Sequence, residues 1–222
     1  MRIDYITLFP EAFKGGPLGV SIVNRAIQEG KVEINIVNLR DYTHDAHRSV
    51  DDAPYGGGAG MLMKVEPIFE AVESLKTDDC RVVLLTPQGN LLTHQTAVRM
   101  STEKHIIFIC GHYEGVDERV RKFLVDEEIS IGNYVLTNGN LPAMVVTDAL
   151  IRHIPGVLGS KDSLKDESFS NGDLLEYPQY TRPAEYRGMS VPEVLLSGNH
   201  GVIEQWRYQQ TVLRTEKRRS DA

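Results

Sequence analysis

The sequence has no long apolar run: none approaches the ~20 residues of a membrane-spanning helix, so no such helix is expected. A signal peptide is also not expected, because Asp4 would interrupt its apolar region. Only two cysteines occur, Cys80 and Cys110, both in or beside apolar strand-like runs. We expect buried reduced thiols, which suit the cytoplasm. No cluster of Cys and His has the spacing of a metal site.

The net charge is −7, which argues mildly against nucleic acid as a partner. The distribution is uneven, because the part from Tyr180 onward carries seven Lys and Arg residues against five acids. A local basic face can bind phosphate groups even when the whole chain is acidic. A solvated helix end explains the same charges equally well. Charge alone therefore leaves both interpretations open.

The 222 residues suffice for one large domain or two small ones. Residues 2–9 alternate as a strand does, residues 18–28 have helical spacing, and residues 32–37 alternate again. This order predicts a parallel sheet and the α/β class. Further helices are expected at 66–75, 91–100, 116–125 and 141–154, and buried strands at 81–86 and 106–110.

The segment 155–188 has a different composition. It is rich in Gly, Pro, Ser and acids and shows no period, so it predicts an interdomain linker. A short helix at 191–196, a turn and a longer helix from 202 to about 219 follow. These elements predict a second, small unit.

The stretch 106–142 organises the chain. Its apolar strand ends in a glycine turn at 111–115, and a second glycine-rich segment follows at 129–142. Loops at the carboxyl ends of strands form the ligand crevice of open α/β sheets. Two such loops close together predict a small-molecule pocket built mainly from backbone. A further turn, at 87–90, is expected to end the strand before them.

A long polar segment at 38–60 shows no helical or strand period. Loops of this length in a compact domain are usually functional or disordered. The functional interpretation is a substrate loop with His47, Arg48 and Asp51 as polar contacts, and the alternative is a mobile surface loop. It is not a Walker loop, because no Gly-Lys-Ser/Thr follows its glycines.

Seven short motifs then occur in order along nearly the whole chain. They are PYGGGAGM at 54–61, CGHYEGVDER at 110–119, ISIGNYVL at 129–136, LPAM at 141–144, IPGVLG at 154–159, YTRP at 180–183 and LLSGNH at 195–200. Each is weak alone, but seven in order are very specific. Together they resemble the bacterial tRNA (guanine-N1)-methyltransferases of the SPOUT class, which methylate the guanosine immediately 3′ of the anticodon. The resemblance implies the same activity here.

The resemblance also implies a fold that periodicity does not predict. A parallel sheet with helices on both faces would end in a deep trefoil knot, and a small helical carboxyl-terminal domain would follow. The implied parts are a knotted cofactor-binding domain at 1–158, a linker at 159–188 and a tRNA-binding domain at 189–222. A cytoplasmic homodimer with shared active sites and no membrane association is implied as well. The chain ends soon after Arg219, where many relatives continue, so fewer tRNA contacts are expected.

The implied cofactor is S-adenosyl-L-methionine, held by loops of the knot. The residues expected to bind it are Leu85, Thr86, Pro87, Gln88, Gly111, Tyr113, Glu114, Ser130, Ile131, Gly132, Asn133, Tyr134, Val135, Leu136, Gly139 and Pro142. Magnesium is a further expectation, because family members use it and Glu114 is retained. No residue is assigned as a metal ligand.

Two residues receive catalytic roles through the resemblance. Arg152 is expected to stabilise the charge that develops on guanine O6 as N1 loses its proton. Glu167 is expected to take that proton as general base, and Asp166 is the alternative. Without the resemblance, Arg152 would be interpreted as a surface arginine at a helix end. Residues expected to bind tRNA are His47, Arg48, Asp51, Tyr55, Gly57, Gly60, Arg182 and Asn199.

The chain departs from the family pattern at four positions. Glu167 stands where relatives usually have aspartate, Asn133 and Asn140 replace acids, and Asn138 replaces a glycine. Loss of the acids would weaken contacts to the cofactor or a helper cation. Asparagine tolerates left-handed backbone, so the loop shape is expected to persist.

Two other functions stay open from the sequence. One is a ribose 2′-O-methyltransferase of the same class, and the other is a non-catalytic RNA-binding protein. The product distinguishes the three functions: a methyl group on the base, a methyl group on the ribose, or no methylated product.

Overall fold

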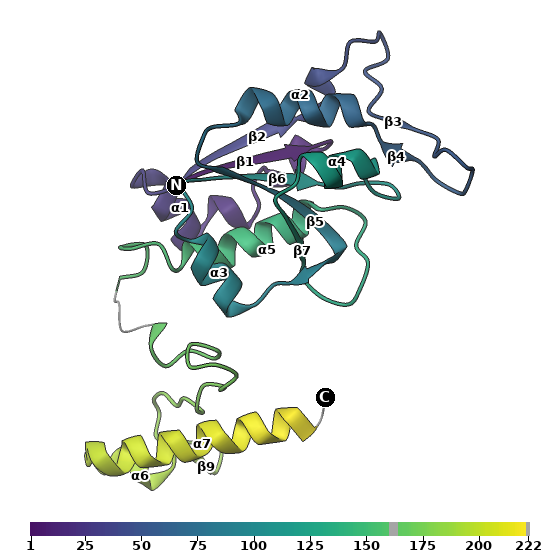
Figure 1. Cartoon of the computed structure of the whole chain (residues 1–222). Helices are drawn as coiled ribbons and strands as arrows, with labels where there is room; N and C mark the ends of the chain where they lie inside the picture. Colours follow the sequence, from purple (N-terminus) through teal and green to yellow (C-terminus); the bar gives the residue numbers. More distant parts are fainter. Residues whose placement is uncertain (160–163, 221–222) are drawn as a thin grey trace. The chain divides into compact units, whose positions relative to one another are not determined.

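The computed structural model describes residues 1–159 and 164–220. Its contacts divide the chain into two units, Met1–Gly159 and Ser160–Ala222 (Figure 1). The two units are described separately below.

The first unit is built on a five-stranded sheet in the order β2-β1-β6-β5-β7. Its strands are β1 (Arg2–Thr7), β2 (Glu33–Asn38), β5 (Cys80–Leu91), β6 (His105–Cys110) and β7 (Glu127–Ser130). Every neighbouring pair is parallel, which confirms the predicted parallel sheet. The β6 strand lies in the middle, and all its residues are buried, as expected for a strand covered on both faces.

Helices cover both faces of this sheet (Figure 1). One face carries α1 (Ser21–Gln28), α3 (His94–Met100) and α5 (Asn140–Ile151), and the other carries α2 (Val65–Leu75) and α4 (Glu118–Phe123). Side chains alternate along a strand, so β6 serves both cores. Phe108 packs into the core with α5, and Ile107 and Ile109 pack into the core with α2.

Two expectations about loops were wrong. The segment 38–60 is not without regular structure, because it contains η3 (Leu39–Tyr42) and β3 (Asp51–Asp52), which pairs with β4 (Leu62–Met63). The expected turn at 87–90 does not end its strand. Instead β5 continues to Leu91 with a bulge, since Leu85 and Asn90 both pair with Ile129. Short 3₁₀ helices η1 (Pro10–Phe13) and η2 (Pro17–Gly19) complete this unit.

The second unit contains β8 (Glu185–Tyr186), β9 (Met189–Ser190), α6 (Glu193–Leu196) and α7 (His200–Ser220). Part of the expected linker lies against α7. The Leu175 amide donates to Thr215 Oγ1 at 3.0 Å, and the Arg207 guanidinium lies over the Tyr177 ring. Residues 160–163 and 221–222 of the expected linker and carboxyl-terminal domain lie outside the described residues. Among the helices that are described, none is both long and apolar enough to cross a membrane.

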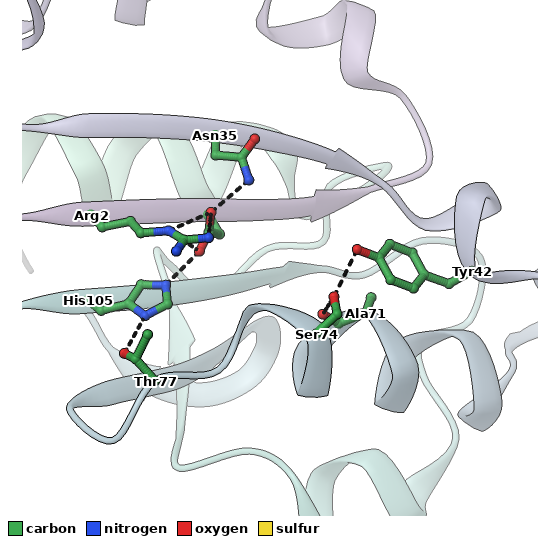
Figure 2. Close-up of polar contacts among 8 residues, drawn as sticks. Arg2, Asn35, Tyr42, Ala71, Ser74, Thr77 and His105 are labelled. Atoms are coloured by element: carbon green, nitrogen blue, oxygen red, sulfur yellow. Dashed lines mark hydrogen bonds and ion pairs between the residues drawn. The ribbon is translucent and has the colours of Figure 1, made fainter.

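A buried polar cluster ties the strands together near their amino ends. The Asp4 carboxylate, fully buried in β1, contacts His105 Nε2 at 2.5 Å and accepts a hydrogen bond from Asn35 Nδ2 at 2.9 Å. Figure 2 shows Arg2, Asn35 and His105 turned toward this carboxylate, with Thr77 on the other side of the His105 ring. At this end of the sheet, side-chain hydrogen bonds connect neighbouring strands. At the carboxyl ends, the strands continue into loops.

Candidate active site

A cavity of about 670 Å³ lies at the bulge of β5 and at the carboxyl ends of β6 and β7. Three loops form it: the bulge of β5, the glycine turn after β6 and the segment between β7 and α5. Its lining residues are Leu62, Leu84, Leu85, Thr86, Pro87, Gln88, Gly111, His112, Tyr113, Glu114, Gly115, Val116, Glu118, Arg121, Ile129, Ser130, Ile131, Gly132, Tyr134, Val135, Leu136, Thr137, Asn138, Gly139 and Pro142. The carboxyl-end pocket expected from residues 106–142 is thus present.

Two of these loops are in direct contact. The Gly139 amide donates to the Gly111 carbonyl at 2.8 Å. A Cβ at position 139 would lie 2.8 Å from Cys110 Cα and from Gly111 N, which is closer than side chains tolerate. Glycine at this position therefore lets the segment before α5 cross directly over the turn after β6. This crossing closes one wall of the cavity.

The turn after β6 also joins the cavity to the long polar segment. Tyr113 adopts a left-handed backbone with φ of 56° and lines the cavity. Burial, together with a hydrogen bond to Asp51, raises the pKa of Tyr113. The His112 ring packs edge-on against both Phe9 and Tyr113. These contacts hold the turn in place from the side of the long segment.

The chain as a whole can now be compared with known proteins. The family model described as tRNA (guanine-1)-methyltransferase TrmD matches residues 1–222. The chain belongs to this family. Two curated relatives, tRNA (guanine-N(1)-)-methyltransferases of Staphylococcus aureus strains MRSA252 and JH9, are each 57% identical over 222 residues, which is 100% of this chain and 90% of theirs.

The residues that the family resemblance suggested for the cofactor gather at the cavity. All of them line it except Asn133, which is exposed on the same loop. The sequence interpretation did not include other lining residues, namely Leu62, Leu84, His112, Gly115, Val116, Glu118, Arg121, Ile129, Thr137 and Asn138. His112 and Glu118 belong to the motif at 110–119. The cofactor residues predicted in that motif could therefore have indicated these two residues as well. Arg121 lies outside every motif, and no local pattern marks it.

Two of the asparagines that depart from the family pattern have structural partners. The Asn138 side chain accepts a hydrogen bond from the Asn140 amide at 3.0 Å, at the start of α5. The Asn140 side chain is buried and accepts one from Thr7 Oγ1 at 2.8 Å. Asn140 does not line the cavity. The position of the Asn140 side chain therefore does not support the expectation that this substitution removes a contact to the cofactor.

The residues suggested for tRNA on the long segment lie outside the cavity lining. Arg48 forms an ion pair with Asp41 and donates from Nε to the Arg40 carbonyl at 3.1 Å. Tyr55 is fully exposed, and His47 is exposed on the same segment. Gly57 has an open, left-handed backbone, whereas Gly60 lies against the Glu114 side chain. The segment thus presents polar and aromatic groups beside the glycine turn. The other two suggested residues, Arg182 and Asn199, belong to the second unit.

The residues with suggested catalytic roles are distributed over both units. Arg152 terminates α5 in the first unit and does not line the cavity. Glu167 is half-buried and belongs to the second unit. Asp166 is exposed there and lies 3.5 Å from the Tyr177 hydroxyl. Among residues 1–159 and 164–220, no group of three or more His, Cys, Asp or Glu side chains could hold a metal ion.

Proposed function

We propose that this chain transfers a methyl group from S-adenosylmethionine to N1 of the guanosine immediately 3′ of the anticodon in tRNA. One observation carries the proposal: in a chain of this family, the bulge of β5 and the loops at the carboxyl ends of β6 and β7, all in one parallel sheet, surround one cavity. Open α/β sheets bind ligands at this edge.

The cavity suits this cofactor in size and lining. Small-molecule pockets usually measure about 300–1,000 Å³ and combine apolar walls with a few polar groups. Here the apolar lining residues include Leu85, Ile129 and Leu136, and the polar ones include Thr86, Gln88 and Ser130. The carboxylates of Glu114 and Glu118 also line the cavity and would favour a positively charged ligand. When bound, the cofactor supplies an electrophilic methyl group on a sulfonium.

The crossing of residues 131–139 over the turn at Gly111 is compatible with a trefoil knot, which we include in the proposal. It would bring three loops around one ligand. The contact between Gly139 and Gly111 supports this arrangement, because the two segments touch through their backbones.

Two residues are proposed to act on the base. Guanine N1 carries a proton at neutral pH and must lose it to become nucleophilic. We assign the general base to Glu167, with Asp166 as the alternative, because a carboxylate can accept this proton. Arg152 would stabilise the negative charge that moves to O6.

The position of Arg152 favours an active site shared by two chains. The α5 helix has 12 residues and begins at the cavity, so it places Arg152 about 18 Å away along its axis. Leu141 and Val145 are exposed on the same helix, and the spacing 141, 145, 148, 152 follows one face. The two exposed apolar side chains on this face suit a contact with a second copy of the chain. In a homodimer, the Arg152 of each chain could serve the cavity of the other.

The tRNA would contact both units. The long segment offers His47, Arg48, Asp51 and Tyr55 beside the glycine turn, and Gly57 leaves space for a base removed from its stack. Gly60 belongs to the same segment but lies against Glu114. The second unit offers Arg182, Asn199 and the basic end of α7, which consists of Lys217, Arg218 and Arg219. We propose residues 1–158 as the cofactor-binding domain, 159–188 as a linker and 189–222 as the helical tRNA-binding domain.

The proposal also includes magnesium and a cytoplasmic location. Magnesium typically keeps several waters and binds one or two protein carboxylates, and Glu114 is the residue that would bind it. The chain provides no larger set of ligands among its described residues, so no step is derived through a metal. Both cysteines are free, which agrees with a reducing compartment such as the cytoplasm.

The deciding experiment is methyl transfer from labelled S-adenosylmethionine to an unmodified tRNA with guanosines at and after the last anticodon position. Nucleoside analysis should give 1-methylguanosine. A 2′-O-methylated nucleoside would show the sister activity instead, and tRNA binding without product would show a non-catalytic protein.

Two variants test the general base in the same assay. Glu167→Gln should retain cofactor binding and lose most turnover, whereas Asp166→Asn should retain turnover. The reverse pattern would transfer the role to Asp166.

A further inference from the structure

An arginine that lies outside the motifs of the chain holds one wall of the cavity. Arg121 on α4 donates from Nη1 to Gln88 Oε1 at 2.5 Å, across 33 positions of sequence. Gln88 belongs to the bulge of β5 and lines the cavity. The same arginine lines the cavity as well. Arg121 therefore connects a helix outside the sheet to the loop that forms the cavity wall.

Arg121 is itself held by an acid on the neighbouring strand. Its Nε and Nη2 donate to the two carboxylate oxygens of Glu128 at 3.2 and 2.6 Å. Both side chains are only 26% exposed, and Glu118 adds an ion pair at 3.5 Å. A planar guanidinium that is bound by two parallel hydrogen bonds has a fixed orientation. The Nη1 atom, which also makes the ion pair with Glu118, donates to Gln88 from this fixed orientation.

The bulge has a second anchor at its base. Gly89 packs so closely on β7 that a Cβ there would lie 2.5 Å from the Glu128 carbonyl carbon and the Ile129 nitrogen. The backbone contact fixes where the bulge rejoins the sheet. By contrast, the Gln88 side chain is exposed, and within the described part of the chain only Arg121 forms a hydrogen bond with it. The position of the outer part of the bulge, Thr86 to Gln88, therefore depends on Arg121.

We propose that Arg121 is a positioning residue for the cofactor site, acting through Gln88 to hold the bulge of β5 at the cavity wall. The inference rests on the proposed function, because it assumes that S-adenosylmethionine occupies this cavity. Arg121 acts by pre-organising the wall before the ligand arrives, which reduces the ordering that binding would otherwise require. Its removal should weaken cofactor binding and leave tRNA binding and the chemical step nearly unchanged.

The test compares Arg121→Met, Gln88→Ala and the double variant in the full-length chain. Calorimetric titration with S-adenosylmethionine should show binding weakened on the order of tenfold in each single variant, as expected for loss of a charge-assisted hydrogen bond. The double variant should be no weaker than the worse single variant, because both changes break one connection. Steady-state assays should show a raised KM for the cofactor, a kcat within about twofold of wild type and unchanged tRNA affinity.

Lys122→Met is the matched control. Lys122 is the next residue on α4, is 64% exposed and, among residues 1–159 and 164–220, pairs only with Glu118, at 3.9 Å. This variant should bind the cofactor as wild type does. Cofactor affinity in Arg121→Met equal to wild type would overturn the proposal. The proposal would also be overturned if the losses of cofactor affinity in the two single variants multiplied in the double variant. Arg121 would then not act through Gln88.

Hydrogen–deuterium exchange separates this inference from the proposed function. In protein without cofactor, Arg121→Met should speed exchange in peptides covering 86–91 and leave those covering 111–117 unchanged. Unchanged exchange at 86–91 would overturn the inference, whatever ligand the cavity binds. If wild type bound no S-adenosylmethionine, the proposed function would fail while the exchange result still decided the role of Arg121. Should Arg121→Met fail to fold, Gln88→Ala gives the same readout at an exposed position.

Discussion

Thr7, the last residue of β1, donates its hydroxyl proton to the side-chain carbonyl of Asn140, the first residue of α5, at 2.8 Å. The two residues are 1% and 3% exposed, so neither group has access to water as an alternative partner. Thr7 Oγ1 also accepts from the Phe9 amide at 3.0 Å. This hydrogen bond fixes the start of α5 against the central sheet, directly after the segment that lines the cavity. A neutral amide is less costly to bury here than the acid of the family pattern would be.

Removing one side of this pair should destabilise the chain. Asn140→Ala leaves the buried Thr7 hydroxyl with one fewer partner, and we expect a loss of about 1–3 kcal/mol in the free energy of unfolding. Thr7→Val should cost a similar amount. The double variant should lose less than both single losses combined, because the hydrogen bond is removed only once. Urea unfolding of the four proteins measures this coupling, and strictly additive losses would contradict it.

The Asn138 side chain should contribute to the stability of α5. Its carbonyl accepts from the Asn140 amide, which otherwise lacks a helical partner in the first turn. Asn138→Ala should cost about 1 kcal/mol, the typical value for loss of a capping side chain. Asn133→Ala, at an exposed position of the same loop, is the control and should leave the urea midpoint unchanged. Equal stability of Asn138→Ala and wild type would show that the amide finds another acceptor.

The buried carboxylate of Asp4 should be among the most sensitive positions of the fold. Asp4→Ala leaves the His105, Asn35 and Arg2 side chains without their shared partner, and removal of one member of a buried ion pair typically costs about 3–5 kcal/mol. Thermal and urea unfolding report the change. Asp79→Ala removes an acid that is 62% exposed and paired with Lys104, and it should have little effect. Similar melting curves for both variants would contradict the proposed importance of the cluster.

Stability should fall at alkaline pH because two buried groups stay protonated in the folded chain. Burial raises the pKa of the Tyr5 hydroxyl and of the Cys110 thiol. In the unfolded chain, a thiol releases its proton near about pH 8.5 and a tyrosine near about pH 10. The unfolded state therefore binds fewer protons above these values, so stability is fully present below them and decreases as pH rises.

The thiol contribution can be isolated by substitution. Between about pH 8 and pH 10, Cys110 should account for up to about 2 kcal/mol of the loss. Cys110→Ala should therefore show a shallower decline of the urea midpoint with pH. Cys80→Ala, which removes the half-buried cysteine, should decline as wild type does. Parallel curves for Cys110→Ala and wild type would show that another group causes the decline.

The crossing of the two cavity loops should not tolerate a side chain at Gly139. In Gly139→Ala the new methyl group would lie 2.8 Å from Cys110 Cα, so the segment before α5 must move away from the turn. We expect cofactor affinity to fall by at least about tenfold, with a loss of stability of about 1–3 kcal/mol from overpacking. Gly19→Ala, where nothing lies within 4 Å of the added Cβ, is the matched control. Normal cofactor binding in Gly139→Ala would argue against this crossing as a cavity wall.

Much of the fold and part of the candidate site could be predicted from the sequence. The apolar run at 106–110 was correctly interpreted as a buried strand, because near-continuous apolar residues occur where a strand is covered on both faces. Glycine turns after such strands correctly indicated a pocket at their carboxyl ends. The extent of β5 was predicted wrongly, since Pro87 and Gly89 are typical of a turn but here form a bulge. Pairing of β5 with β7 on both sides of the bulge prevailed over local propensity.

By itself, the sequence determined the helices of the first unit and the strands β1, β2 and β6, because apolar periodicity records which side of each element is buried. It did not indicate β7 or the full extent of β5. Its ordered motifs also determined membership of the family. Only the tertiary structure decided which distant side chains meet. The sequence suggested a lost cofactor contact at Asn140, whereas its side chain accepts a hydrogen bond from Thr7. No motif marked Arg121, which donates a hydrogen bond to Gln88. Such hydrogen bonds depend on how elements far apart in sequence are brought together, and a residue's type and near neighbours do not contain that information.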